Sequence, residues 1–327
     1  MKKLLKKTLK LILPIVLGGF ILYWVYRDFD FSRVGEVLRH GTNWWWMLFS
    51  LLFGVLAQVF RGWRWRQTLE PLDAFPKRSD CVNAIFISYA ASLVVPRIGE
   101  VSRCGVLAKY DNVSFAKSLG TVVTERLVDT LTILLITGIT VLLQLPIFVT
   151  FLQQTGTKIP SLVHLLTSVW FYIILFCFIG VAILLYYLRK TLFFYERVKG
   201  FVLNIWEGIM SLKGVRNIPL FIFYTLAIWA CYFLHFYFTF YCFAFTAHLG
   251  ILAALVMFVG GTFAVIVPTP NGAGPWHFAI ISMMMLYGVN VTNAGIFALI
   301  VHGIQTFLVV LLGIYGLAAL PFTNRQR

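Results

Sequence analysis

A helix-breaking stretch, Val95-Pro96-Arg97-Ile98-Gly99-Glu100, interrupts an apolar segment of the chain. A second one, Pro268-Thr269-Pro270-Asn271-Gly272-Ala273-Gly274-Pro275, interrupts another. Proline removes a backbone donor and clashes with the preceding turn, and glycine adds backbone freedom, so helices end there. The halves on either side are too short to cross a bilayer comfortably, because a spanning helix needs about 20 apolar residues. We therefore expect 81–110 and 250–288 to form re-entrant helical hairpins.

The composition places these segments in a membrane. The chain has 327 residues, of which 60% are apolar and 12% charged, against about 45–50% and about 25% in soluble domains. The formal net charge is +15, but the positive residues lie mostly in short groups between apolar runs. That pattern orients membrane proteins, so we expect no nucleic-acid binding. The cysteines and histidines show no metal-ligand spacing, and we expect no metal or cofactor.

Six further apolar segments are long enough to span. They predict an all-α polytopic membrane protein, a helical bundle of about six full spans plus the two hairpins, with spans at 11–27, 43–60, 117–145, 163–188, 217–247 and 293–320. The first span resembles a signal peptide, but bulky residues follow it, so we expect it to stay uncleaved. Trp44–Trp46 and the stretch Arg61–Arg66 flank the second span and are interpreted as outer and inner headgroup-level residues, or as a contact for anionic lipid.

Lysine and arginine counts predict the sidedness. If both broken segments are re-entrant hairpins and the N-terminus is cytoplasmic, 18 of the 27 positive residues lie in cytoplasmic pieces and 4 lie outside. This excess favours cytoplasmic N- and C-termini, with the first hairpin entering from the cytoplasm and the second from outside. The same counts also allow one broken segment to be a pair of full spans.

Opposed broken segments in corresponding positions predict an inverted repeat with a site at the midplane, although the two halves share no direct residue-level repeat. We expect a single transmembrane domain over 1–327. Its first half covers about 1–145 and its second about 217–320, joined by an amphipathic interfacial connector at 191–215.

Six ionisable residues stand on or beside membrane-depth helices. They are Arg97, Glu100, Arg103, Glu125, Arg126 and Asp129. The first three share one helix face by their i, i+3, i+6 spacing, and Glu125 and Asp129 share another. Because an unpaired charge at the bilayer centre is costly, we expect the first hairpin to dock on the following helix and pair these charges. The cluster is either a structural ion-pair network or a polar cavity for a charged headgroup, since arginine suits phosphate.

The second break carries a different pair of candidates. His277 follows the proline- and glycine-rich stretch directly, and Asn271 lies within it. We expect His277 to begin the second half-helix of the hairpin, where exposed N–H groups favour anions. A histidine in an apolar helix can equally be structural, and a substrate or proton role is the alternative.

These motifs resemble those of the lysylphosphatidylglycerol synthase transmembrane-region family, the flippase-like integral membrane proteins. The likeness covers about residues 10–320. Its first signature matches Pro96, Arg97, Gly99, Glu100 and Arg103, followed by Glu125, Arg126 and Asp129, and its second matches Pro268, Pro270, Asn271, Gly272 and Gly274. The family usually carries a glutamate where this chain has His277. The resemblance implies a bundle with two re-entrant hairpins that moves lipids between leaflets. Because only seven residues follow Leu320, we expect this chain to lack the aminoacyl-transfer domain of larger members and not to synthesise aminoacyl lipids itself.

We therefore expect a protein of the inner (cytoplasmic) membrane that binds and flips a phospholipid or lipid-linked headgroup, without ATP hydrolysis, because a P-loop is absent. Its expected partners are membrane lipids with a phosphate-bearing headgroup and a separate lipid-modifying enzyme. One alternative is a transferase acting on a lipid-linked substrate, with Asp28 and Asp30 as metal-binding acids. Another is a scaffold subunit that transports nothing. The sequence does not indicate the oligomeric state.

Overall fold

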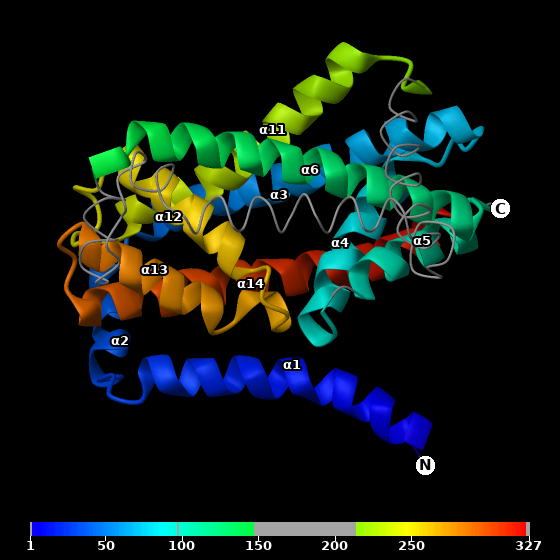
Figure 1. The fold of residues 1–327 in the computed structure, drawn as a ribbon. Helices are drawn as coiled ribbons and strands as arrows, with labels where there is room; N and C mark the ends of the chain where they lie inside the picture. Colours follow the sequence, from blue (N-terminus) through cyan, green and yellow to red (C-terminus); the bar gives the residue numbers. More distant parts are fainter. Residues whose placement is uncertain (1, 97, 147–213, 325–327) are drawn as a thin grey trace, which may run out of the picture.

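The computed structural model describes residues 2–96, 98–146 and 214–324, and these residues form helices joined by short connections (Figure 1). Within these ranges there is no β-strand, only an isolated bridge between Thr42 and Phe243. The helices of the first half are α1 (Lys2–Tyr26), α2 (Ser32–Glu36), the π-helix η1 (Val37–Gly41), α3 (Trp44–Leu69), η2 (Glu70–Leu72), α4 (Arg78–Val94), α5 (Ile98–Tyr110) and α6 (Phe115–Leu143). Those after residue 213 are α11 (Ile218–Tyr237), η5 (Phe238–Cys242), α12 (Ile251–Ala264), η6 (Pro270–Gly272), α13 (Pro275–Leu286) and α14 (Val291–Thr323).

Asparagine caps set the start of three long helices. The side chains of Asn43, Asn217 and Asn290 accept hydrogen bonds from backbone N–H groups in the first turns of α3, α11 and α14. Such caps satisfy one of the four N–H groups that a helix start leaves free. These helices therefore begin close to where the apolar periodicity of the sequence predicts them.

Four described helical segments are long and apolar enough to span a membrane: Trp44–Leu72, Phe115–Leu143, Ile218–Cys242 and Val291–Thr323. They confirm the spans expected at 43–60, 117–145, 217–247 and 293–320. The first expected span corresponds to α1, whose apolar part runs over Leu13–Tyr26. The span expected at 163–188 and nearly all of the connector at 191–215 fall outside the described residues.

Both broken segments fold as helical hairpins. Helices α4 and α5 pack against each other, as do α12 and α13. The four helices contain 17, 13, 14 and 12 residues, so at about 1.5 Å per residue each is shorter than the roughly 30 Å core of a bilayer. The expected pairs of half-length helices are confirmed.

The two hairpins lie toward opposite ends of the bundle. Figure 1 shows α4 and α5 toward the end that carries the start of α1 and the end of α14, whereas α12 and α13 lie toward the other end. Helix α14 runs between them and packs against α4 and α13. The arrangement agrees with entry of the two hairpins from opposite sides.

Each hairpin has its own apolar core. Buried residues of the start of α3, α11, α12, α13 and α14 form one cluster, including Met47, Phe236, Met257, Ile280 and Phe297. Buried residues of the end of α3, α4, α5 and α6 form the other, including Trp65, Leu69, Ile85, Leu107 and Val122. Each hairpin is thus fixed by packing against the long helices, which positions the polar residues that it carries.

Candidate functional site: a buried ion-pair network on α6

Two acids on α6 organise the polar residues of the first half. Glu125 and Asp129 lie one helical turn apart and are both buried, at 0% and 6% exposure. The i, i+4 spacing directs both carboxylates to the same face of α6. That face meets α3 and α5.

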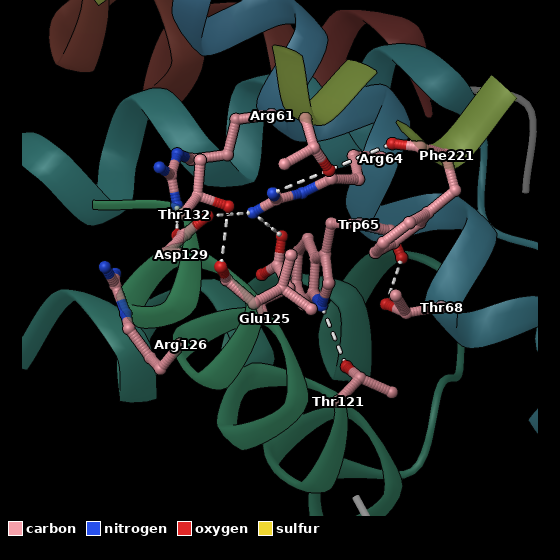
Figure 2. Close-up of polar contacts among 12 residues, drawn as sticks. Arg61, Arg64, Trp65, Thr68, Thr121, Glu125, Arg126, Asp129, Thr132 and Phe221 are labelled. Carbon is pink, nitrogen blue, oxygen red and sulfur yellow. Dashed lines mark hydrogen bonds and ion pairs between the residues drawn. The ribbon is translucent and has the colours of Figure 1, made fainter. Parts of the chain in front are cut away.

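Helix α3 supplies two arginines to this pair. The guanidinium of Arg61 donates from Nη1 to Oδ2 of Asp129 at 2.7 Å, and Arg64 donates from Nη2 to Oδ1 of Asp129, also at 2.7 Å. Arg64 also reaches Oε1 of Glu125 at 3.5 Å and Oγ1 of Thr225 on α11 at 3.2 Å. Figure 2 shows Arg61 and Arg64 converging with Glu125 and Asp129 between α3 and α6. The network therefore links three spanning helices.

The first hairpin adds a third buried arginine. Nη1 of Arg103 lies 2.6 Å from Oε2 of Glu125, and the two side chains form an ion pair. The guanidinium of Arg103 also lies 4.6 Å from the centre of the Trp65 ring, and the indole of Trp65 donates to Thr121 at 2.9 Å. Arginine is well suited to such combined ionic and stacking contacts. The expected docking of hairpin one on α6 is thereby confirmed.

The buried network carries one more positive than negative side chain among the described residues. Among the described acids, Arg61, Arg64 and Arg103 form ion pairs with Glu125 and Asp129, and each carboxylate is shared by two arginines. Within the described part of the chain, four buried guanidinium nitrogens make no hydrogen bond: Nε of all three arginines and Nη2 of Arg103. The described part of the network therefore holds three guanidinium groups against two carboxylates.

A second ion pair lies at the accessible edge of the network. Nε of Arg126 contacts Oε1 of Glu100 at 2.7 Å, and the side chains are 46% and 34% exposed. In Figure 2 the guanidinium of Arg126 stands apart from the contacts that join Arg61, Arg64, Asp129 and Glu125. Of the six predicted charged residues, the structure thus joins Arg103 to Glu125 and Arg126 to Glu100. Arg97 lies outside the described residues.

The interpretation of Arg61, Arg64 and Trp65 as headgroup-level residues was wrong. These three residues are 3%, 0% and 0% exposed, because the end of α3 packs against α4, α6 and α11. A signal was present in the sequence. The three continue the i, i+3, i+4 stripe of buried α3 residues that includes Gly54 and Ala57, a spacing that marks an inward face.

The second break forms a cluster of polar side chains with the neighbouring helix α14. His277, at 3% exposure, is the third residue of α13, which confirms its expected place at the start of the second half-helix. Its ring lies 4.5 Å from that of His302, centre to centre. A ring nitrogen of His302 lies 3.0 Å from the carbonyl of Asn271, whose amide donates to Thr306 at 2.7 Å. The break is therefore tied to α14.

Left-handed backbone at the second break requires its glycines. Gly272 and Gly274 have φ values of 72° and 93°, and Asn271 has 52°. The intervening η6, which starts at Pro270, packs against α4 and α1, so the second break meets the first hairpin through α4. Pro96 and Pro268 flank the ends of α4 and α12 as expected for helix breakers.

Gly274→Ala should destabilise the protein more than Gly288→Ala. Both glycines have positive φ, at 93° and 80°, so alanine costs about 1 kcal/mol at either. A methyl group at 274 would also lie 2.8 Å from Ile21 Cβ and 3.0 Å from the Gly18 carbonyl of α1, whereas nothing lies within 4 Å at 288. Overpacking adds about 1–3 kcal/mol. Thermal unfolding in detergent measures the difference. Equal losses of stability in the two variants would show that α1 does not pack closely against Gly274.

Comparison with known proteins gives one match. Residues 11–313 match the family described as Lysylphosphatidylglycerol synthase TM region. No curated protein and no solved structure matches the chain. Within the described residues, no group of three or more histidine, cysteine, aspartate or glutamate side chains is arranged to hold a metal ion.

Proposed function

We propose that this chain, which belongs to the lysylphosphatidylglycerol synthase TM-region family, binds a phospholipid through its phosphate-bearing headgroup and moves it between leaflets without ATP hydrolysis of its own. It is a multi-pass membrane protein, since the family is a membrane region and four described helical segments can span. Lipid movement is the function that its polar site supports best.

One observation carries the proposal: a buried network of charged side chains in an apolar bundle, with a second, accessible ion pair beside it. A charge at the bilayer centre costs about 2.5–3.5 kcal/mol even on mild scales, and such residues usually mark a transport pathway. Here seven charged residues from α3, the first hairpin and α6 lie together, namely Arg61, Arg64, Glu100, Arg103, Glu125, Arg126 and Asp129. The partly exposed Glu100–Arg126 pair lies next to the buried network. This arrangement suits a lipid headgroup that the protein holds while the lipid crosses the membrane.

The roles within the site follow from exposure. Glu100 and Arg126 form the accessible part, together with Arg97 as expected from the sequence, and the buried residues hold the hairpin. On the opposite side, His277 and Asn271 line the second break, and they are proposed to meet the headgroup as it approaches the outer leaflet. A separate lipid-modifying enzyme is the expected supplier or consumer of the lipid.

The proposed location is the cytoplasmic membrane, with both termini in the cytoplasm. Two observations support this. Lysine and arginine are concentrated in the pieces assigned to that side, and the start of α1 and the end of α14 lie at the same end of the bundle in Figure 1.

Leaflet exchange of labelled phospholipids in vesicles tests the function. The purified chain should exchange lipid faster than protein-free vesicles do, and the double variant Glu100→Ala/Arg126→Ala should lose most of this activity. The matched control is Glu70→Ala, which breaks the Arg66–Glu70 pair on α3 and η2, 3.2 Å apart and also partly exposed. If the wild type exchanges no lipid, the function is wrong. If the double variant keeps the wild-type rate, the site is wrong.

A further inference from the structure

We propose that the His277–His302 pair is a proton-binding site. A proton bound there loosens the start of α13 from α14 and speeds lipid movement past the second hairpin. The proposal rests on the proposed lipid movement and adds the ion that controls it.

Two backbone contacts decide which ring nitrogen can take a proton. The backbone N–H of Gly274 donates to Nδ1 of His277 at 3.4 Å. Because Nδ1 accepts, the neutral ring of His277 carries its hydrogen on Nε2. Nε2 of His302 lies 3.0 Å from the carbonyl oxygen of Asn271, and a carbonyl only accepts, so this nitrogen also carries a hydrogen. The lone pair that remains for a further proton is on Nδ1 of His302.

The pair stands where the second hairpin meets a spanning helix. His277 is the third residue of α13, and His302 lies on α14. Their rings are 4.5 Å apart, centre to centre. Asn271 also reaches α14 through Thr306, to which its amide donates at 2.7 Å. Since His302 and Thr306 are one helical turn apart, the polar contacts of the break with α14 meet at the pair.

An added proton is incompatible with these contacts. Protonated His302 carries hydrogen on both ring nitrogens, and the nitrogen of His277 that faces no backbone partner carries one too, so neither ring can accept from the other. His277 could offer a lone pair only by moving its hydrogen to Nδ1, which would break its contact with the Gly274 N–H. Separation of the rings and loss of that contact both loosen the start of α13.

The neighbouring elements offer no charge that compensates the proton. The elements packed against η6, α13 and α14 are α1, α3, α4 and α12. Tyr26 faces the pair from α1, with its ring 5.7 Å from that of His277. Helices α12, α13 and α14 and residues 11–26 of α1 contain no Asp, Glu, Lys or Arg. The other charged or titratable side chains of α3 and α4 lie toward the first hairpin, namely Arg61, Arg64, Arg66, Arg78, Cys81 and Tyr89.

The acid of α4 is also remote from the pair. Asp80 accepts from Asn324, which directly follows α14. Asn324 lies 22 positions beyond His302, so the two are about 33 Å apart along the helix. A positive charge buried without a partner is costly. The proton is therefore accommodated by opening the contact between the hairpin and α14.

The pH dependence of lipid exchange tests the proton site. Exchange of labelled phospholipid is measured in vesicles with the same buffer on both sides, at about pH 5.5 and about pH 7.5. The wild type should exchange lipid roughly tenfold faster at the lower pH, because the protonated fraction of a histidine with the ordinary pKa of about 6.5 rises about tenfold between the two. In His302→Gln, whose amide can still donate to the Asn271 carbonyl but which binds no proton, this ratio should fall close to one.

A second histidine on a backbone carbonyl supplies the matched control. His235 of α11 lies 2.8 Å from the carbonyl of Ser50 through Nδ1, and it stands outside the second break. His235→Asn keeps a donor at this place and should keep the wild-type ratio of rates.

The outcomes separate the two proposals. Equal rates of the wild type at both pH values, or an acceleration that survives in His302→Gln, would overturn the proton site and leave lipid movement standing. Exchange at neither pH would overturn the proposed lipid movement.

Tryptophan fluorescence tests the proton site without lipid. The ring of Trp276 lies 5.2 Å from that of His302, and a protonated imidazole quenches a neighbouring indole. The emission of Trp276 is the difference between the wild type and Trp276→Phe. It should fall between about pH 7.5 and about pH 5.5, and it should stay constant when both proteins carry His302→Gln. Constant emission without that substitution would overturn the proton site, whether or not lipid moves.

Discussion

Asp129→Asn is expected to lower the free energy of unfolding by about 3–5 kcal/mol, the cost of removing one partner from a buried ion pair. Asp129 binds both Arg61 and Arg64 at 2.7 Å. Without its charge, Glu125, which lies 3.5 Å from Arg64, is the one remaining acid among the described residues that pairs with the three buried arginines. Thermal unfolding followed by tryptophan fluorescence in detergent measures the loss.

Two further variants make this prediction specific. Asp28→Asn removes an acid that contacts Arg27 at the similar distance of 2.9 Å, but with both side chains mostly exposed, and it should leave unfolding nearly unchanged. Adding Arg61→Met to Asp129→Asn should restore part of the stability, because it removes one uncompensated charge. An Asp129→Asn protein that unfolds at the wild-type temperature would show that the network is not needed to hold α3 against α6.

Gly99→Ala is expected to open the first hairpin and to abolish most lipid exchange. A methyl group on Gly99 would collide with the backbone carbonyl of Ser88 and the hydroxyl of Ser92 on α4. Backbone cannot move aside cheaply in a packed hairpin, so the substitution should cost at least about 1–3 kcal/mol. It would also displace α5, which carries Glu100 and Arg103.

Gly105→Ala on the same helix is the matched control for this change. Nothing lies within 4 Å of a methyl group at that position, and alanine favours a helix over glycine by up to about 1 kcal/mol. Its stability should therefore equal or exceed that of the wild type, with normal exchange. Equal behaviour of the Gly99 and Gly105 variants, in unfolding and in exchange, would contradict the close packing of α4 on α5.

The sequence alone determined the fold class, the hairpins and part of the site. Proline and glycine end helices through local sterics, so the breaks at Pro96 and at Pro268–Pro275 were readable without tertiary information. Apolar length predicted the described spans. The docking of the first hairpin on α6, with its charges paired to the acids there, followed from the cost of an unpaired charge in the membrane.

Only the tertiary structure decided which arginines the buried acids bind. Arg61 and Arg64 stand near the end of an apolar stretch, where arginine usually reaches toward headgroups. Their helical spacing marks an inward face, but it does not indicate which helices or acids that face meets. Their burial depends on α6 and α11 packing against α3, contacts between segments some 60 to 160 positions apart in the chain. The same packing leaves Glu100 and Arg126 at the accessible edge. The residue types fixed the chemistry of the site, and long-range packing divided it into a buried part and a reachable part.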